Sequence, residues 1–222
     1  GDENLDELKD QFHRMVQELQ FVPADEIPRI DLYMDQVLTF MEEHLGKSSR
    51  DPENDKILTK TMINNYVKNG VLIPPVRKKY GMDHMILLLM IYYLKSYLSI
   101  GDIRQVLEPL KERYAGNASE NAERERESGN GQEAAEDEER KEEPSMQSLE
   151  EIYRTVYEDM SDELEAVQED ADRQFRRVRE TFPDSGTEDE TRLQKFALIA
   201  RMSTEIYLKK LFIERLLDEK ED

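Results

Sequence analysis

The sequence contains no cysteine, which excludes disulfide bonds, thiolate metal ligands and a cysteine nucleophile. It also lacks tryptophan, and hydrophobic residues account for 37% of the 222 positions, the same share as charged residues. This balance is typical of helices with wide solvated faces joined by polar segments, and it is unlike the dense core of an α/β enzyme.

Long hydrophobic runs are also absent. The longest, MILLLMIYYL at 85–94, has ten residues, whereas a membrane-spanning helix needs roughly 20. This run therefore predicts a buried helix. Because no basic-then-apolar leader opens the sequence, we expect a soluble, cytoplasmic protein that makes no membrane contact.

Motifs for catalysis or metal binding are missing. The nine glycines form neither a phosphate-binding loop nor a G-x-S-x-G turn. His13, His44 and His84 are far apart, and Asp10 three residues before His13 is more typical of a polar surface pair than of a metal site. We expect a non-enzymatic protein with no cofactor and no metal.

Apolar residues at helical spacing predict a mainly α fold. We expect one helix within 4–21, one within 32–45 with Asp31 as its N-cap, and one over 84–97 with Asp83 as its N-cap.

The C-terminal region predicts two long helices. Apolar residues step by threes and fours from Leu149 to Phe182, which indicates one long helix with a heptad-like stripe. Thr187 and Glu190 form a predicted capping box for a second helix that ends near Leu217. We expect an antiparallel, coiled-coil-like hairpin. A second apolar stripe on its last helix requires a further partner, either a third helix or another subunit.

Composition divides the chain into three parts. Residues 1–114 are predicted to form a helical domain with a helix-turn-helix over about 31–107, and residues 148–222 form the hairpin. Between them, residues 115–147 have almost no large apolar side chain, which is typical of a solvated low-complexity linker. Within it, residues 120–143 carry eleven acidic and four basic residues.

The charge distribution singles out one stretch, LTKTMINNYVKNGVLIPPVRKKY at 58–80. The whole chain has a net charge of −20, yet this stretch contains no Asp or Glu. Over 51–115 the chain has ten Lys or Arg and seven Asp or Glu, a net charge of +3. An acidic protein thus keeps one neutral-to-basic segment.

The local structure of this segment follows from its residue types. Thr59 or Thr61 is suited to cap a short helix that ends near Asn69. Gly70 follows where a left-handed residue is needed, and Val71 is placed to pack back on the helix. Two prolines then prevent the helix from resuming, and VRKKY becomes an exposed turn or short strand.

The order of these features resembles the winged helix-turn-helix of MerR-type regulators. The matching positions are Tyr66, Gly70, Val71, Leu72, Pro74, Tyr80 and 98–107. The resemblance implies a recognition helix at 60–69, a wing at 76–80 and dimerisation through a long later helix. Two features depart from the pattern, because 46–57 is a long polar loop and YGMDH replaces the usual aromatic–arginine pair of the wing.

A narrower resemblance covers roughly residues 20–110. IPRIDLYMDQVLTF together with LTKTMINNYVKNG is similar to an uncharacterised bacterial family of unknown function found in Firmicutes. That family implies a fold but no established activity.

We therefore expect a transcriptional regulator that binds double-stranded DNA and forms a homodimer through its C-terminal helices. Asn amides can pair with adenine edges, and Lys or Arg can neutralise phosphate. The candidate DNA-contacting residues are Lys60, Thr61, Asn64, Asn65, Lys68, Arg77, Lys78, Lys79 and Tyr80. The alternative is a non-enzymatic interaction module that binds a protein partner through the helix-turn-helix scaffold and the C-terminal helices. In that case Asn64 and Asn65 belong to an ordinary polar surface. The sequence indicates neither a target site nor a small-molecule effector.

Overall fold

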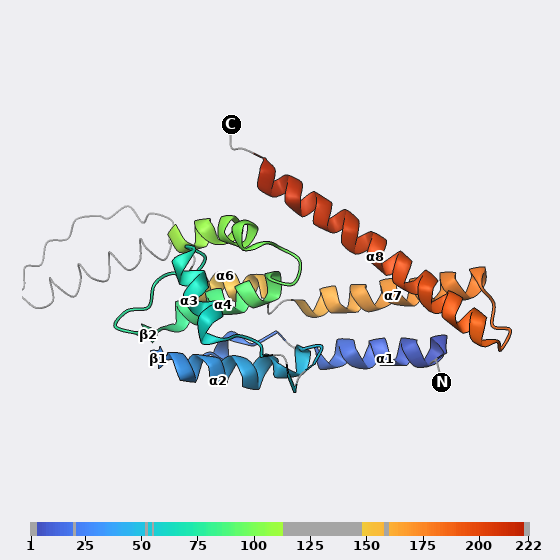
Figure 1. Ribbon diagram of the computed structural model, residues 1–222, viewed down its shortest axis with the longest axis horizontal. Coiled ribbons are helices and arrows are strands. Elements are labelled where there is room, and N and C mark those ends of the chain that lie inside the picture. The colour runs from blue at the N-terminus through green and yellow to red at the C-terminus, as the bar shows by residue number, and fades with distance from the viewer. Residues whose placement is uncertain are drawn as a thin grey trace, which may run out of the picture. The chain divides into compact units, whose positions relative to one another are not determined.

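A computed structural model describes residues 4–19, 21–51, 53–54, 56–112, 148–157 and 160–219 (Figure 1). The fold is mainly helical, as predicted, and the described residues divide between two compact units. We call residues 22–156 the α4 unit, and residues 1–21 with 157–222 the α8 unit. The predicted acidic linker lies outside the described residues.

The α4 unit combines short helices with one small antiparallel sheet. Its elements are 3-10 turns at Ala24–Glu26 and Gly46–Ser48, strands β1 (Leu32–Tyr33) and β2 (Lys79–Tyr80), helices α2 (Met34–Leu45), α3 (Lys60–Lys68) and α4 (Met82–Leu94), a helical stretch at 100–112, and α6 (Leu149–Tyr157). In the sheet, Leu32 pairs with Tyr80 and Tyr33 with Lys79.

Helix α4 forms the centre of this unit, as its apolar sequence predicts. Every residue from His84 to Ile91 is buried. A helix that is apolar all round needs neighbours on every side. Buried side chains from the surrounding elements supply them, including Val22, Ile27, Leu32, Val37, Met41, Leu45, Ile63, Leu72, Ile103, Leu107 and Tyr153.

Two of the predicted helix starts are wrong. Asp31 does not cap α2, because Leu32 and Tyr33 are drawn into the strand pair and the helix begins at Met34. The Tyr33 backbone N–H instead donates to Gln36 Oε1 at 2.9 Å. Asp83 lies inside α4, which begins at Met82 after Gly81. At α2 the strand pairing, which links distant residues, overrides a local capping signal. At α4 the cap itself is local, because the Gly81 N–H donates to His84 Nδ1 at 3.1 Å.

Helix α3 forms as its sequence predicts. Thr59 is the N-cap, and its hydroxyl accepts from the Met62 N–H at 3.2 Å. At the other end Gly70 has φ of 68° and donates to the Val67 carbonyl, while the Val71 N–H donates to the Tyr66 carbonyl at 2.8 Å. These two bonds make up the Schellman cap, so the glycine fixes where the chain turns away from α3.

The predicted long helix over 149–182 is wrong, because two helices occupy this range. Helix α6 ends at Tyr157, and α7 (Ser161–Thr181) follows. Their apolar residues serve different cores. Tyr153 of α6 is fully buried in the α4 unit, where its hydroxyl donates to the Val22 carbonyl at 2.6 Å. A continuous sequence stripe therefore does not imply a continuous helix.

The α8 unit packs α1 (Leu5–Glu18) against α7 and α8 (Glu188–Asp218). Its core consists of Leu5, Ala171, Phe175, Val178 and Leu198, with Leu8, Phe12, Ala197 and Met202 packed against it. The α7–α8 hairpin confirms the prediction, and Thr187 caps α8 through the Glu190 N–H. Helix α1 is a third helix in this unit, but it does not cover the second stripe, of which Ile199, Ile206 and Leu216 remain exposed.

This packing corrects the predicted domain boundaries. Residues 1–21 were expected with the helix-turn-helix, but they belong to the α8 unit. Ion pairs support the assignment, since His13 Nε2 lies 2.6 Å from Asp172 Oδ1 and Arg179 pairs with Asp6 at 2.6 Å. Across the described ranges, no helix is both long and apolar enough to cross a membrane.

Candidate nucleic-acid interface

Helix α3 separates its side chains into two faces. Ile63 and Tyr66 are buried, and Met62 and Val67 are half-buried. The opposite face is exposed and carries Lys60, Thr61, Asn64, Asn65 and Lys68. This face presents two cations, a hydroxyl and two amides, and it contains no carboxylate.

A tight two-residue turn follows α3 and presents two cations at its tip. Val76 and Lys79 exchange backbone hydrogen bonds of 3.0 and 2.9 Å, and both residues between them have positive φ, 51° at Arg77 and 62° at Lys78. This is the type I′ geometry, in which Asn and Gly are favoured. An L-residue with positive φ costs roughly 1–2 kcal/mol relative to the usual negative φ. The turn is therefore strained, and it exposes two cationic side chains.

Lys79 is held at the base of the turn. It belongs to β2, its side chain is half-buried, and its ammonium lies 5.2 Å from the centre of the Tyr33 ring. The pairing of Tyr33 with Lys79 across the sheet places the two side chains together. Lys79 therefore contributes charge near the turn while it packs on an aromatic ring.

Tyr80 is a correction to the predicted contact residues. Its side chain is only 3% exposed, and its ring meets His84 edge-on with 5.5 Å between the ring centres. Burial also raises the pKa of its phenol. The alternation of the strand turns Tyr80 inward beside the outward Lys79, so Tyr80 supports the turn from inside and is not available to a ligand.

His84 holds both sides of the turn segment, a role that the sequence did not predict. Its Nδ1 accepts from the Gly81 N–H at 3.1 Å, and its Nε2 lies 3.0 Å from the Pro74 carbonyl oxygen. The Pro74 carbonyl can only accept, so Nε2 carries a proton. Because Nδ1 accepts a hydrogen bond, it carries none, and the ring is neutral. Burial lowers the pKa of His84, which favours this neutral form. One side chain thus joins the residues on either side of the 76–79 turn.

The C-terminal end of α3 is also supported from the 100–112 helix. Lys111 donates to the Gly70 carbonyl oxygen and pairs with Glu108 at 2.6 Å. This helix begins with a capping box, in which Ser99 Oγ accepts from the Asp102 N–H at 3.1 Å and the Ser99 N–H donates to Asp102 Oδ2 at 3.4 Å. A cation at the end of α3 complements the partial negative charge of the helix terminus. Sequence spacing gave no signal for this contact, which spans 41 positions.

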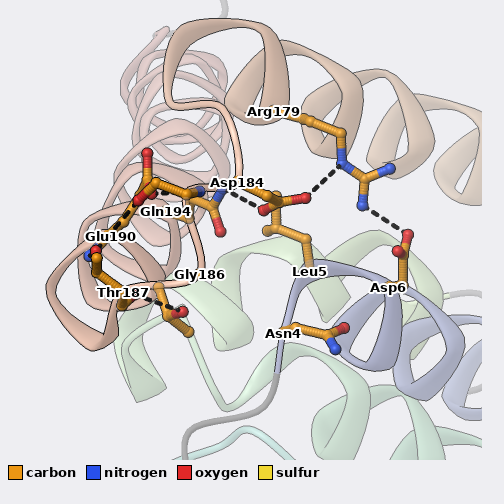
Figure 2. A pocket seen from close by; sticks show the side chains of 11 residues that line it. Asn4, Leu5, Asp6, Arg179, Asp184, Gly186, Thr187, Glu190 and Gln194 are labelled. Carbon is orange, nitrogen blue, oxygen red and sulfur yellow. Dashed lines mark hydrogen bonds and ion pairs between the residues drawn. The ribbon is translucent and has the colours of Figure 1, made fainter.

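The α8 unit contains a separate hollow of about 240 Å³ at the start of α8 (Figure 2). Its charged groups satisfy one another: Arg179 lies between Asp6 and Asp184, and Glu190 accepts from the Ser185 N–H at 2.6 Å. The Gln194 amide donates to Asp184 at 2.8 Å. These contacts describe a helix-capping cluster and leave no group directed at a ligand. Nor does the described part of the chain contain a group of three or more His, Asp or Glu placed to hold a metal.

Comparison with known proteins finds a family match for the α4 unit. Residues 22–126 match the model of a domain of unknown function, DUF1836, which agrees with the predicted resemblance to a family of unknown function over roughly residues 20–110. The match begins at Val22, where the α4 unit also begins, and it includes α3, the 76–79 turn and α4. No curated protein and no solved structure matches the chain.

Proposed function

We propose that the protein is a MerR-like, DNA-binding transcriptional regulator and that the α4 unit binds double-stranded DNA. In this proposal, α3 enters the major groove and the 76–79 turn acts as a wing on the phosphate backbone. The observation that carries the proposal is the carboxylate-free exposed face of α3, followed in the chain by a strained turn with two cations at its tip.

The dimensions and chemistry of α3 suit a major groove. Nine residues give a helix of about 13 Å, and the groove is about 12 Å wide. Asn64 and Asn65 can each pair with the N6 and N7 edge of an adenine, and Lys60 and Lys68 at the two ends can reach phosphates.

The turn supports the same proposal from its energetics. A type I′ turn is most stable with Asn–Gly, yet the chain places Arg and Lys there. A strained conformation is maintained only when the surrounding structure enforces it, and such positions are often functional. His84 and the β1–β2 pair supply that enforcement.

The acidic charge of the rest of the chain favours a defined orientation on DNA. The net charge is −20, so most of the surface repels phosphates. The α3 face and the turn are then the surface that DNA can approach. A cytoplasmic regulator with this charge distribution would bind DNA through one face and would not cover the DNA non-specifically.

The proposal is tested by selecting bound fragments from genomic DNA and then measuring affinities by fluorescence anisotropy at several salt concentrations. Asn64→Ala with Asn65→Ala is expected to reduce the preference for the selected fragment over random DNA by at least ten-fold. Arg77→Ala with Lys78→Ala is expected to weaken binding to both DNAs and to lower the salt slope by about 2.

A matched control removes the same charge elsewhere. Arg14 and Lys195 are exposed residues of the α8 unit, so Arg14→Ala with Lys195→Ala should leave affinity and salt slope unchanged. Absence of binding at low salt, or equal losses in the control, would contradict the proposal. Recovery of one stoichiometric protein partner in place of DNA would support the alternative interaction module.

A further inference from the structure

Helices α7 and α8 pack closely at one end of the hairpin and separate toward the other (Figure 1). At the closed end Phe175, Val178 and Leu198 are buried. Further along, the Gln174 amide donates to Glu205 at 2.8 Å, and the Arg201 guanidinium donates to Gln174 at 2.6 Å. Past this polar cluster the apolar side chains of both helices become exposed.

The packed face of α8 continues beyond the closed end. Gln194, Leu198, Met202 and Glu205 follow a spacing of three or four, and the same spacing leads to 209, Phe212 and Leu216. Phe212 is 63% exposed and Leu216 52% exposed. The second half of α8 thus extends an existing interface with apolar side chains, Phe212 and Leu216, that are more than half exposed.

The packed face of α7 continues in the same way. Val178, Phe175 and Ala171 are buried, and the spacing of three or four leads back to Val167 and Leu164. Val167 is 48% exposed and Leu164 is half-buried. The first half of α7 and the second half of α8 are therefore two incomplete faces of one hairpin.

These two faces carry opposite charge. Residues 161–172 of α7 contain six Asp or Glu and no Lys or Arg. Residues 206–217 of α8 contain Lys209, Lys210 and Arg215 against Glu214 alone. Pairing α7 with α7, or α8 with α8, would place like charges together, whereas pairing α7 with α8 joins opposite charges.

We propose that a second copy of this chain fills the opening, with the second half of α8 from each copy packed on the first half of α7 from the other. A two-fold axis makes both contacts at once, because each copy offers the same two faces. The result is a four-helix arrangement that continues the apolar seam of the hairpin. The proposal does not depend on DNA binding.

Sedimentation velocity on the full chain tests the proposal through charge reversal. Chain X carries Lys209→Glu with Arg215→Glu, which changes the net charge of residues 206–217 from +2 to −2. Chain Y carries lysine at four exposed acidic positions, Asp162→Lys, Glu163→Lys, Glu165→Lys and Glu169→Lys, which changes the net charge of residues 161–172 from −6 to +2. We expect the unaltered chain to be a dimer, and X and Y alone to dissociate with a Kd at least ten-fold higher. In an equimolar mixture both contacts again join opposite charges, so X and Y should form a heterodimer.

An apolar test and its control complete the experiment. Phe212→Glu should also weaken the dimer at least ten-fold, whereas Ile30→Glu, at a 69% exposed site of the α4 unit, should not. The proposal is overturned if the unaltered chain is still a monomer at about 100 μM, a concentration 100-fold above a micromolar Kd. It is equally overturned if Y dimerises like the unaltered chain, or if X and Y do not associate when mixed.

Discussion

At the scale of single residues, His84 is the side chain whose chemistry the fold constrains most. It accepts from Gly81 and donates to the Pro74 carbonyl, and protonation of Nδ1 would remove the first of these bonds. Burial lowers its pKa below the usual 6.5, so the folded state binds its proton later than the unfolded state as the pH falls. The two hydrogen bonds that neutral His84 makes with Gly81 and Pro74 therefore depend on pH.

The sign of this effect gives a prediction. Between the lowered pKa and 6.5 the unfolded chain binds more protons, so the free energy of unfolding of the α4 unit should fall as the pH drops below about 6.5. Urea denaturation from pH 7.5 to 5 measures it. His84→Leu should be less stable throughout and should lose this slope, whereas His44→Gln should retain it.

Two neighbouring carboxylates also face His84. Asp83 and Asp31 both favour its charged form. Burial raises the pKa of Asp83, and such a shift contributes a slope of the opposite sign at lower pH. Repeating the series with Asp83→Asn separates the two groups. An unchanged slope in His84→Leu would contradict the assignment to His84.

At the scale of elements, α6 is the unexpected component of the α4 unit. It comes from the C-terminal part of the sequence, yet Tyr153 is fully buried beside Tyr93 and Val22. Ion pairs extend the contact, with Arg29 to Glu150 at 2.8 Å and Arg154 to Asp25 at 2.5 Å. These pairs are at least partly exposed, so the buried tyrosine is expected to provide most of the stabilisation.

Removing one oxygen tests the role of α6. Tyr153→Phe leaves the Val22 carbonyl without its donor, which should lower the free energy of unfolding by about 1–3 kcal/mol. Hydrogen exchange of α4 amides, read beside urea denaturation, locates the loss in the α4 unit. Tyr207→Phe on α8, where the ring is 62% exposed, is the matched change and should have no effect. Equal stability of both variants would show that α6 does not support α4.

The elements also show how far local sequence determines this fold. Thr59, the Gly70 turn and the inward face of α3 were predictable, because caps and periodicity act within a few residues. The start of α2 was not, since it depends on β1 pairing with β2 across 48 positions, from Leu32 to Tyr80. The break between α6 and α7 and the inward turn of Tyr80 likewise depend on tertiary contacts.

At the scale of the molecule, one acidic chain combines a region similar to DUF1836 with a hairpin unit. The exposed polar residues predicted to contact DNA lie on α3 and the turn, all within the α4 unit. The proposed dimer contacts lie in the α8 unit. The proposed surfaces for DNA and for self-association therefore fall on different units, and each can be altered without changing the residues of the other.

The most direct test of the central proposal replaces the strained turn by its most stable equivalent, Arg77→Asn with Lys78→Gly. Because both residues have positive φ, the variant should be more stable by about 1 kcal/mol or more. Anisotropy with the selected fragment should nevertheless show weaker DNA binding and a salt slope lower by about 2, since two phosphate-binding cations are lost. Unfolding cannot explain a loss of binding in a stabilised protein. Unchanged affinity and salt slope in this variant would contradict DNA binding through the turn.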